Sequence, residues 1–194
     1  TASSSPRIER ITVDVTGGTL VNMGIKNNNS SPIMTNITAT ASGNVDNRGV
    51  VNEDSASPTM IYVTANGSGG TESNIGVHNK TSSSATMINV TATGSGGIFG
   101  RGVLIDASSP TLVGVTATGS GGSTNSFGVF SRTSSSPFIQ NSILTGDTKG
   151  LRIFSDSPGT RVVNSKIIGG ALNDATVGTQ CRGNYDSNLA DVSC

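Results

Sequence analysis

The stretches SSATMINVTATGSGG, residues 83–97, and SSPTLVGVTATGSGG, residues 108–122, decide the fold of this chain. They are near copies of one another, and they lie within a longer series of similar segments. The segments are about 26 residues apart, and a fixed period of this length is the sequence signature of a stacked repeat architecture. Outside these two stretches, the Ser-Ser-Pro signature recurs with its proline at Pro6, Pro32, Pro58 and Pro137, and in a weaker copy at Pro158.

Apolar residues recur at four fixed places in each repeat. Polar residues alternate with them at period two, which predicts short, half-buried strands rather than helices. A unit of this length cannot bury its apolar face alone, so successive units must stack with their strands parallel. Counted two, five and seven residues after the proline and then after a later glycine, the four columns are Ile8/Met34/Met60/Met87/Leu112/Ile139, Ile11/Ile37/Val63/Val90/Val115/Ser142, Val13/Ala39/Ala65/Ala92/Ala117/Leu144 and Ile25/Val50/Val77/Val103/Val129/Leu151.

We therefore predict an all-β fold, a right-handed parallel β-helix of six to seven coils with no significant helix. The repeats are expected to fill residues 1–170, with coils that begin near residues 3, 30, 56, 83, 108, 135 and 156. Each coil should hold two or three strands of three to five residues. We expect the aligned glycines to turn a corner of each coil with positive φ; they are Gly24, Gly49, Gly76, Gly102, Gly128 and Gly150.

The repeated pattern SSPT-x-x-NVTAT-x-SGG resembles the right-handed β-helix repeat proteins of bacterial secreted and cell-surface polypeptides. The resemblance covers about residues 3–170. It implies the fold, but the same architecture carries lyases, hydrolases, tailspikes and adhesins, so it does not imply one activity. No catalytic motif of such proteins can be matched residue by residue.

The two ends of the chain differ. The first repeat begins almost at once, which suggests additional upstream coils or a homo-oligomer such as a trimer, because an open solenoid end is an unpaired edge. After the repeats, residues 171–194 are expected to form a C-terminal cap. Cys181 and Cys194, the only cysteines, are expected to form a disulfide there, which indicates a secreted, extracellular or cell-surface protein. The alternative is a thiol or metal pair, for which no further ligands accompany them.

Composition excludes several function classes. Ser, Thr, Asn and Gly make up half of the 194 residues, only 12% are charged, and 12 basic residues balance 12 acidic ones. A neutral chain without a basic cluster predicts no nucleic-acid partner. No apolar run is long enough to predict membrane insertion. We expect no metal and no cofactor.

A ladder of outward threonines is the first candidate binding face. Two residues span about 6.7 Å along a strand and coils lie about 4.8 Å apart, so the ladder forms a regular grid that resembles the ice-binding face of β-solenoid antifreeze proteins. The alternative is that threonine is simply a strong strand former. Asp14 and Asn66 interrupt the grid. Its members are Thr38, Thr40, Thr64, Thr91, Thr93, Thr116 and Thr118.

Gly/Ser-rich loops before the glycine column form a second candidate, because loops along one edge of a scaffold often bind ligands. Arg48 and Arg101 precede that column and could hold an anionic sugar, with Phe99 and Phe127 as the aromatic residues of the loops. The alternative for these loops is simple turn formation.

Two ionisable features have catalytic alternatives that the sequence does not favour. Asp54 and Asp106 align two coils apart, at about 9.6 Å, near the upper limit for inverting glycosidases, but nothing apolar nearby would raise either pKa. His78, the only histidine, is expected to be exposed.

The sequence thus favours a non-enzymatic extracellular β-helix, a scaffold, surface-display or adhesin-like module of a larger secreted protein. One alternative is an ice-binding protein. The other is a polysaccharide-binding or polysaccharide-active β-helix of the tailspike or lyase type, so the expected partners are a polysaccharide or an ice surface.

Overall fold

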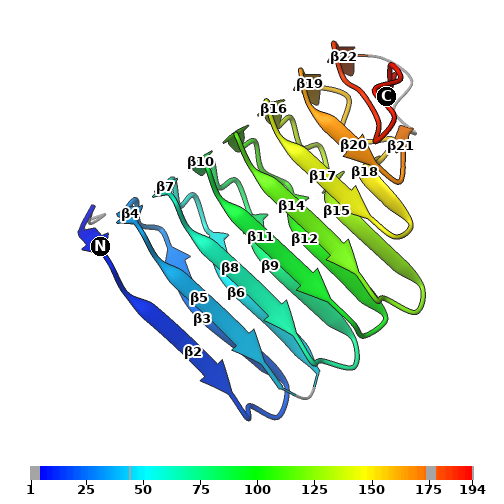
Figure 1. Ribbon diagram of the computed structural model, residues 1–194. Helices are drawn as coiled ribbons and strands as arrows, with labels where there is room; N and C mark the ends of the chain where they lie inside the picture. Colours follow the sequence, from blue (N-terminus) through cyan, green and yellow to red (C-terminus); the bar gives the residue numbers. More distant parts are fainter. Residues whose placement is uncertain (1–4, 44, 174–177, 194) are drawn as a thin grey trace.

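The computed structural model describes residues 5–43, 45–173 and 178–193, and these form a parallel β-solenoid of about six coils (Figure 1). The described residues contain no helix, and all named strands pair in parallel. Each coil contributes one strand to each of three sheets, and the ribbon rises coil by coil from the N-terminal to the C-terminal end. The predicted all-β parallel solenoid is confirmed.

Three kinds of strand alternate along the chain. The first sheet holds strands of three residues, the second strands of three to five residues, and the third mostly strands of eight residues, longer than the sequence pattern predicts. The first sheet is β1 Arg7–Glu9, β4 Ile33–Thr35, β7 Thr59–Ile61, β10 Thr86–Ile88, β13 Thr111–Val113, β16 Phe138–Gln140, β19 Arg161–Val163 and β22 Gln180–Arg182; the second is β2 Thr12–Thr16, β5 Thr38–Ser42, β8 Thr64–Ser68, β11 Thr91–Ser95, β14 Thr116–Ser120, β17 Ile143–Gly146 and β20 Lys166–Ile168; the third is β3 Val21–Asn28, β6 Asp46–Glu53, β9 Ser73–Lys80, β12 Phe99–Asp106, β15 Asn125–Arg132, β18 Lys149–Ile153 and β21 Ala171–Asn173.

The four predicted apolar columns fill the interior. In the central coils their members are fully buried and belong to one continuous core, as Met60, Val63, Ala65 and Val77 illustrate. The core is built from small and medium side chains because three sheets close around a narrow space. The exception is Ile11, which is 43% exposed in the first coil, where β2 has a paired neighbour on one side only.

Buried asparagine ladders run through the same interior. The amide of Asn47 accepts from Asn22 at 2.9 Å and donates to Asn74 at 3.0 Å. A second ladder joins Asn27, Asn52 and Asn79, with two bonds of 2.8 Å each. A buried amide needs partners for both its donor and its acceptor, and stacking in register supplies them from the neighbouring coils.

The aligned glycines lie inside the strands of the third sheet, so the prediction that they turn a corner with positive φ is wrong. None of them has positive φ, which occurs instead at true corners such as Asn36, Tyr62 and Asn89. The glycines are required by space: a Cβ atom on Gly102 would lie 2.5 Å from the backbone nitrogen of Thr118 in the second sheet. The second sheet therefore packs directly against the middle of each third-sheet strand.

The last part of the chain continues the stack. The segment predicted as a cap contributes β21 to the third sheet and β22 to the first. Cys181, in β22, packs against the core, and Cys194 lies outside the described residues, so their disulfide remains a prediction. A search of the described residues for a helix that could span a membrane finds none.

Candidate binding site on the third sheet

The outward face of the third sheet carries two columns of large side chains. Strict alternation fails at the glycine of each strand, so that residues three apart, such as Arg101 and Leu104, both lie outside. The interior neighbours Val103 and Ile105 belong to the main core, whereas Leu104 belongs to a separate apolar cluster with Ile75, Phe127 and Phe130. Each strand thus presents one outward residue on each side of its glycine to these two columns, because the glycine position interrupts the pleat.

These two outward columns bury one another, although the named strands of the structure place no second layer over them. Ile75 is 1% exposed and Leu104 is 2% exposed. On a flat, uncovered sheet such side chains would be largely accessible. Their burial shows that the two columns pack together across the interruption in each strand, which gives this face of the rod its own small core.

The residues predicted to bind along a loop edge lie on this sheet instead. Phe99 and Arg101 are in β12, Phe127 is in β15 and Arg48 is in β6, so their assignment to loops is wrong. The strands begin several residues before the glycine, which converts most of each predicted loop into a strand. Register places Arg101 beside Phe127, whereas Arg48 lies two strands away from Arg101, with Ile75 between them.

Three consecutive coils combine these side chains into one site, which we call the aromatic–arginine cluster. It lines a hollow of about 230 Å³, which Asn125 also lines. This volume is below the roughly 300–1,000 Å³ of ordinary small-molecule pockets. The hollow therefore fits one ring-sized group at a time. The cluster comprises Phe99, Arg101, Phe127, Phe130, Arg152 and Phe154.

Ring and cation contacts hold the cluster together. Phe130 lies at its centre, with ring centroids 5.2 Å from Phe127 and 6.3 Å from Phe154. The guanidinium carbon of Arg101 lies 4.5 Å from the ring centroid of Phe99 and 5.5 Å from that of Phe130. Arg152 similarly lies 5.6 Å from the Phe154 ring. Such contacts hold the cations over ring faces and fix both partners in place.

Arg101 is the unusual member of this cluster. It is only 9% exposed, its Nη1 donates to Ser73 Oγ at 3.3 Å, and its Nε has no hydrogen-bond partner among the described residues. Burial, together with the nearby charge of Arg132, lowers the pKa of Arg101 to about 10. The guanidinium remains charged at neutral pH but is held in a poorly solvated position.

His78 lies in the outward column beside Leu104, yet it is 6% exposed, so the expectation that it is exposed is wrong. Neither ring nitrogen has a partner in the described structure. Burial, helped by the charges of Arg48 and Lys80, lowers the pKa of His78 to about 3. The imidazole is therefore neutral and acts as part of the small outer core.

Two carboxylates of the third sheet, Asp106 and Glu53, are engaged by cations. Arg132 donates to Asp106 at 2.6 Å, and Lys26 and Lys80 reach Glu53 at 2.5 and 2.6 Å. Burial alone would raise the pKa of Glu53, but the two lysines together lower it to about 2. Searching the described residues finds no group of three or more potential metal ligands.

The predicted alignment of Asp54 with Asp106 is wrong by one residue. Asp106 lies in β12 beside Lys80, whereas Asp54 follows the end of β6 in a turn with positive φ. These two carboxylates therefore do not occupy equivalent positions.

The threonine ladder lies where the sequence places it, on the outward face of the second sheet. Thr91 pairs with Thr64 and Thr116, and Thr93 pairs with Asn66 and Thr118. Thr38 and Thr40 continue the two columns in β5, next to Thr64 and Asn66. All seven side chains are half-buried or exposed. This ladder and the aromatic–arginine cluster are on different sheets, so they are separate surfaces.

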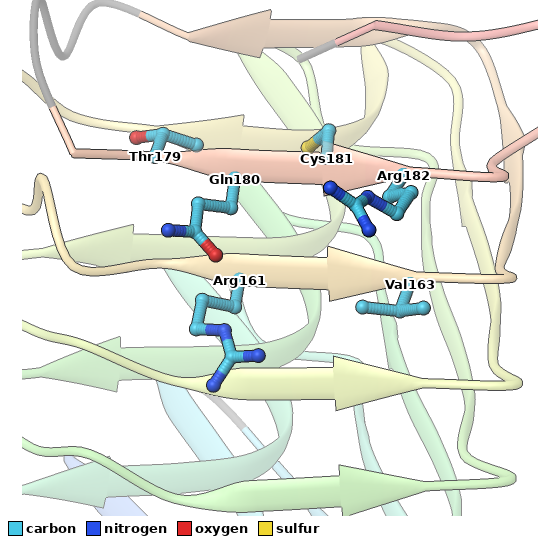
Figure 2. Close-up of a pocket in the computed structure, with 6 residues that line it drawn as sticks. All are labelled: Arg161, Val163, Thr179, Gln180, Cys181 and Arg182. Carbon is cyan, nitrogen blue, oxygen red and sulfur yellow. The ribbon is translucent and has the colours of Figure 1, made fainter.

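A second hollow lies near the C-terminal end, on the outward face of the first sheet (Figure 2). Arg161 and Gln180 lie one above the other on the neighbouring strands β19 and β22, and Arg182 lies beside Val163 in the same register. The hollow is larger, about 620 Å³, but its polar side chains are largely exposed. We therefore place the candidate site at the aromatic–arginine cluster, in which the guanidinium of Arg101 is buried.

Half of the aromatic–arginine cluster could not be found from the sequence pattern. Phe130 and Arg152 stand in the column that also holds His78, and Phe154 directly follows β18. The available signal was the concentration of phenylalanine between residues 99 and 154 in a chain with only five. These residues form one site because each strand presents an outward residue on each side of its glycine.

Comparison with known proteins identifies no family. No family model matches the chain, and no curated protein matches it. Among solved structures, the chain is similar to QnrB1, described as a plasmid-mediated fluoroquinolone resistance protein, at 11% identity over 90% of this chain and 92% of that chain. The TM-score of 0.22 is too low for this likeness to bear on fold or function.

Proposed function

We propose that this chain is a non-enzymatic β-solenoid scaffold, an extracellular display or adhesin-like module, and that it binds polysaccharide through the aromatic–arginine cluster. The observation that carries the proposal is the cluster itself: aromatic rings and arginines from three consecutive coils line one hollow on a face that no named strand covers. Aromatic faces pack against sugar rings, and a rigid solenoid holds them at fixed spacing without ordering cost on binding.

The charged groups of the third sheet support binding rather than hydrolysis. A glycosidase needs a carboxylic acid with a raised pKa next to a second carboxylate. Here the pKa of Glu53 is lowered to about 2, and that of Asp106 is lowered by hydrogen bonds from Thr133 and Arg132, which outweigh the effect of burial. Both groups are held as carboxylates at neutral pH.

Phe99→Ala is expected to weaken polysaccharide binding at least about tenfold, because loss of an aromatic anchor typically costs about 2 kcal/mol. Affinity electrophoresis in gels containing candidate polysaccharides measures the effect, and an assay for new reducing ends tests for cleavage. Phe138→Ala is the matched control, because Phe138 also lies beside an arginine, but on the first sheet. Retention of wild-type binding in Phe99→Ala, or release of reducing ends, would contradict the proposal.

Ice binding through the threonine ladder is a second candidate, supported by the register of β11 and β14. Thr91 lies beside Thr116 and Thr93 beside Thr118, so two adjacent coils present an uninterrupted Thr-x-Thr grid. Asn66 and Asp14 occupy the same column in other coils, which limits the regular area.

Thr91→Tyr combined with Thr93→Tyr should abolish thermal hysteresis if the ladder binds ice, because the two rings would stand above the grid. Thr86→Tyr, in the same coil but on the first sheet, is the control and should leave hysteresis intact. Thermal hysteresis of the wild type is measured first. If the wild type shows none, the proposal of ice binding is wrong.

A further inference from the structure

The charge of Arg101 is not compensated within the described structure. None of the described carboxylates forms an ion pair with Arg101, and its Nε is buried without a hydrogen-bond partner. Burial of a cation is unfavourable unless the cation forms an ion pair or binds an anion. The polar contact that it has, from Nη1 to Ser73 Oγ at 3.3 Å, is to a neutral group.

The nearest acidic residues are already occupied by other arginines. Arg132 donates to Asp106 from Nη2 at 2.6 Å and from Nε at 3.1 Å, and Arg48 donates to Asp46 at 3.3 Å. The two acids attract Arg101 through space but do not contact it. Arg101 therefore gives the hollow that it lines a positive charge that no described carboxylate contacts.

The form of the site restricts the anion. The Arg101 guanidinium lies over phenylalanine rings, and the edge of a guanidinium can donate two parallel N–H bonds to a planar carboxylate. Four phenylalanines line most of the remaining wall, together with Asn125 and Arg152, and the volume of about 230 Å³ admits one ring-sized group. A sugar ring with one carboxylate offers both an apolar face for the rings and an anion for the arginine.

We propose that the aromatic–arginine cluster holds a uronic-acid unit of an acidic polysaccharide, with the sugar carboxylate on the Arg101 guanidinium. This rests on the proposed function, since it names the chemistry of the ligand for the same surface. Phe99 and Phe130 orient the guanidinium, and the hollow accepts the ring that carries the carboxylate.

Titration calorimetry with a polygalacturonate oligomer, its fully methyl-esterified form and a sulfated dextran oligomer tests this assignment. We expect the wild type to bind the free acid at least about tenfold more tightly than the ester, with the preference shrinking as salt is added. Arg101→Met, which keeps the length of the side chain, should bring acid and ester to equal affinity. Arg101→Lys should retain part of the preference, because it keeps the charge but loses the planar fork.

Arg161→Met is the matched control, because Arg161 also lies over a phenylalanine, 5.2 Å from the Phe138 ring, on a different sheet. It should leave both affinities unchanged. The Arg101 variants are first compared with the wild type by circular dichroism and thermal unfolding, and Arg101→Lys keeps the test valid if Arg101→Met unfolds. Equal binding of acid and ester by the wild type, or a preference that survives in Arg101→Met, would overturn the assignment.

The remaining outcomes separate this inference from the proposed function. If the ester binds and Phe99→Ala abolishes that binding, the polysaccharide site stands and the carboxylate assignment is wrong. Tighter binding of the sulfated dextran than of the polygalacturonate also overturns it, in favour of a tetrahedral anion. If none of the three polymers binds, both the assignment and the proposed polysaccharide site fail.

Discussion

Gly76→Ala is expected to destabilise the protein by about 4 kcal/mol or more, which is exceptional for the addition of one methyl group. An ideal Cβ atom at this position would lie 2.5 Å from the nitrogen of Thr93, 2.7 Å from the oxygen of Gly102 and 2.8 Å from the carbonyl carbon of Ala92. All three atoms belong to the backbone, so no side-chain rotamer can relieve the contact. The methyl group would force the second and third sheets apart in the middle of the stack.

Urea unfolding followed by circular dichroism measures this effect, together with the soluble yield for a variant that does not fold. Gly17→Ala is the control, because Gly17 has φ of 80° but nothing within 4 Å of its ideal Cβ position. That substitution carries only the backbone cost of positive φ, about 1 kcal/mol. If Gly76→Ala were no more destabilising than Gly17→Ala, close packing would not be the reason for the glycine column.

This glycine column also marks how far the sequence pattern could predict the structure. Period and alternation were enough to identify the solenoid and all four interior columns, because burial of one face repeats at every coil. They could not distinguish a glycine required for its φ from one required for space. Both produce a glycine column in the repeat. The φ values of these glycines and the 2.5 Å from an ideal Cβ atom on Gly102 to the Thr118 nitrogen separate them.

The same ambiguity explains why the candidate site was predicted only in part. The sequence places Arg48 and Arg101 in one column and Phe127 in a loop, because a polar stretch beside glycine predicts a loop rather than a strand. His78 and Phe130 lie on the outward face and are nevertheless buried. Their burial depends on how each strand departs from alternation at its glycine. Buried Asn52 was missed for a related reason, since its partners come from neighbouring coils rather than from its own segment.

His78 is expected to make the stability of the protein depend on pH between pH 5 and pH 7. The pKa of its imidazole is about 3 in the folded protein, against an ordinary value of 6.5. Between these values the unfolded chain binds a proton that the folded protein does not, so stability is complete above pH 6.5 and falls as the pH is lowered toward 3. At 1.36 kcal/mol per pKa unit, unfolding at pH 5 should require about 2 kcal/mol less than at pH 7.

His78→Leu should remove this dependence and leave stability at pH 7 unchanged or higher. The substitution fits the site, because the paired residues in the coils on either side are Val51 and Leu104. It also replaces two buried nitrogens that have no partner in the described structure. Urea unfolding at pH 5, 6 and 7 measures the slope for each variant.

The pH window isolates this one residue. His78 is the only histidine in the chain. The pKa of Glu53 changes from an ordinary 4.5 to about 2 in the folded protein. The stability that Glu53 contributes is therefore present above pH 4.5 and is lost as the pH falls toward 2. Glu53→Gln is therefore the control: it breaks the contacts to Lys26 and Lys80 and lowers stability, but it should lower it equally at pH 5 and pH 7. A slope that persists in His78→Leu would mean that another group causes the pH dependence. Absence of a slope in the wild type would mean that the imidazole can bind its proton in the folded state, and that the outer core around Leu104 is accessible to water.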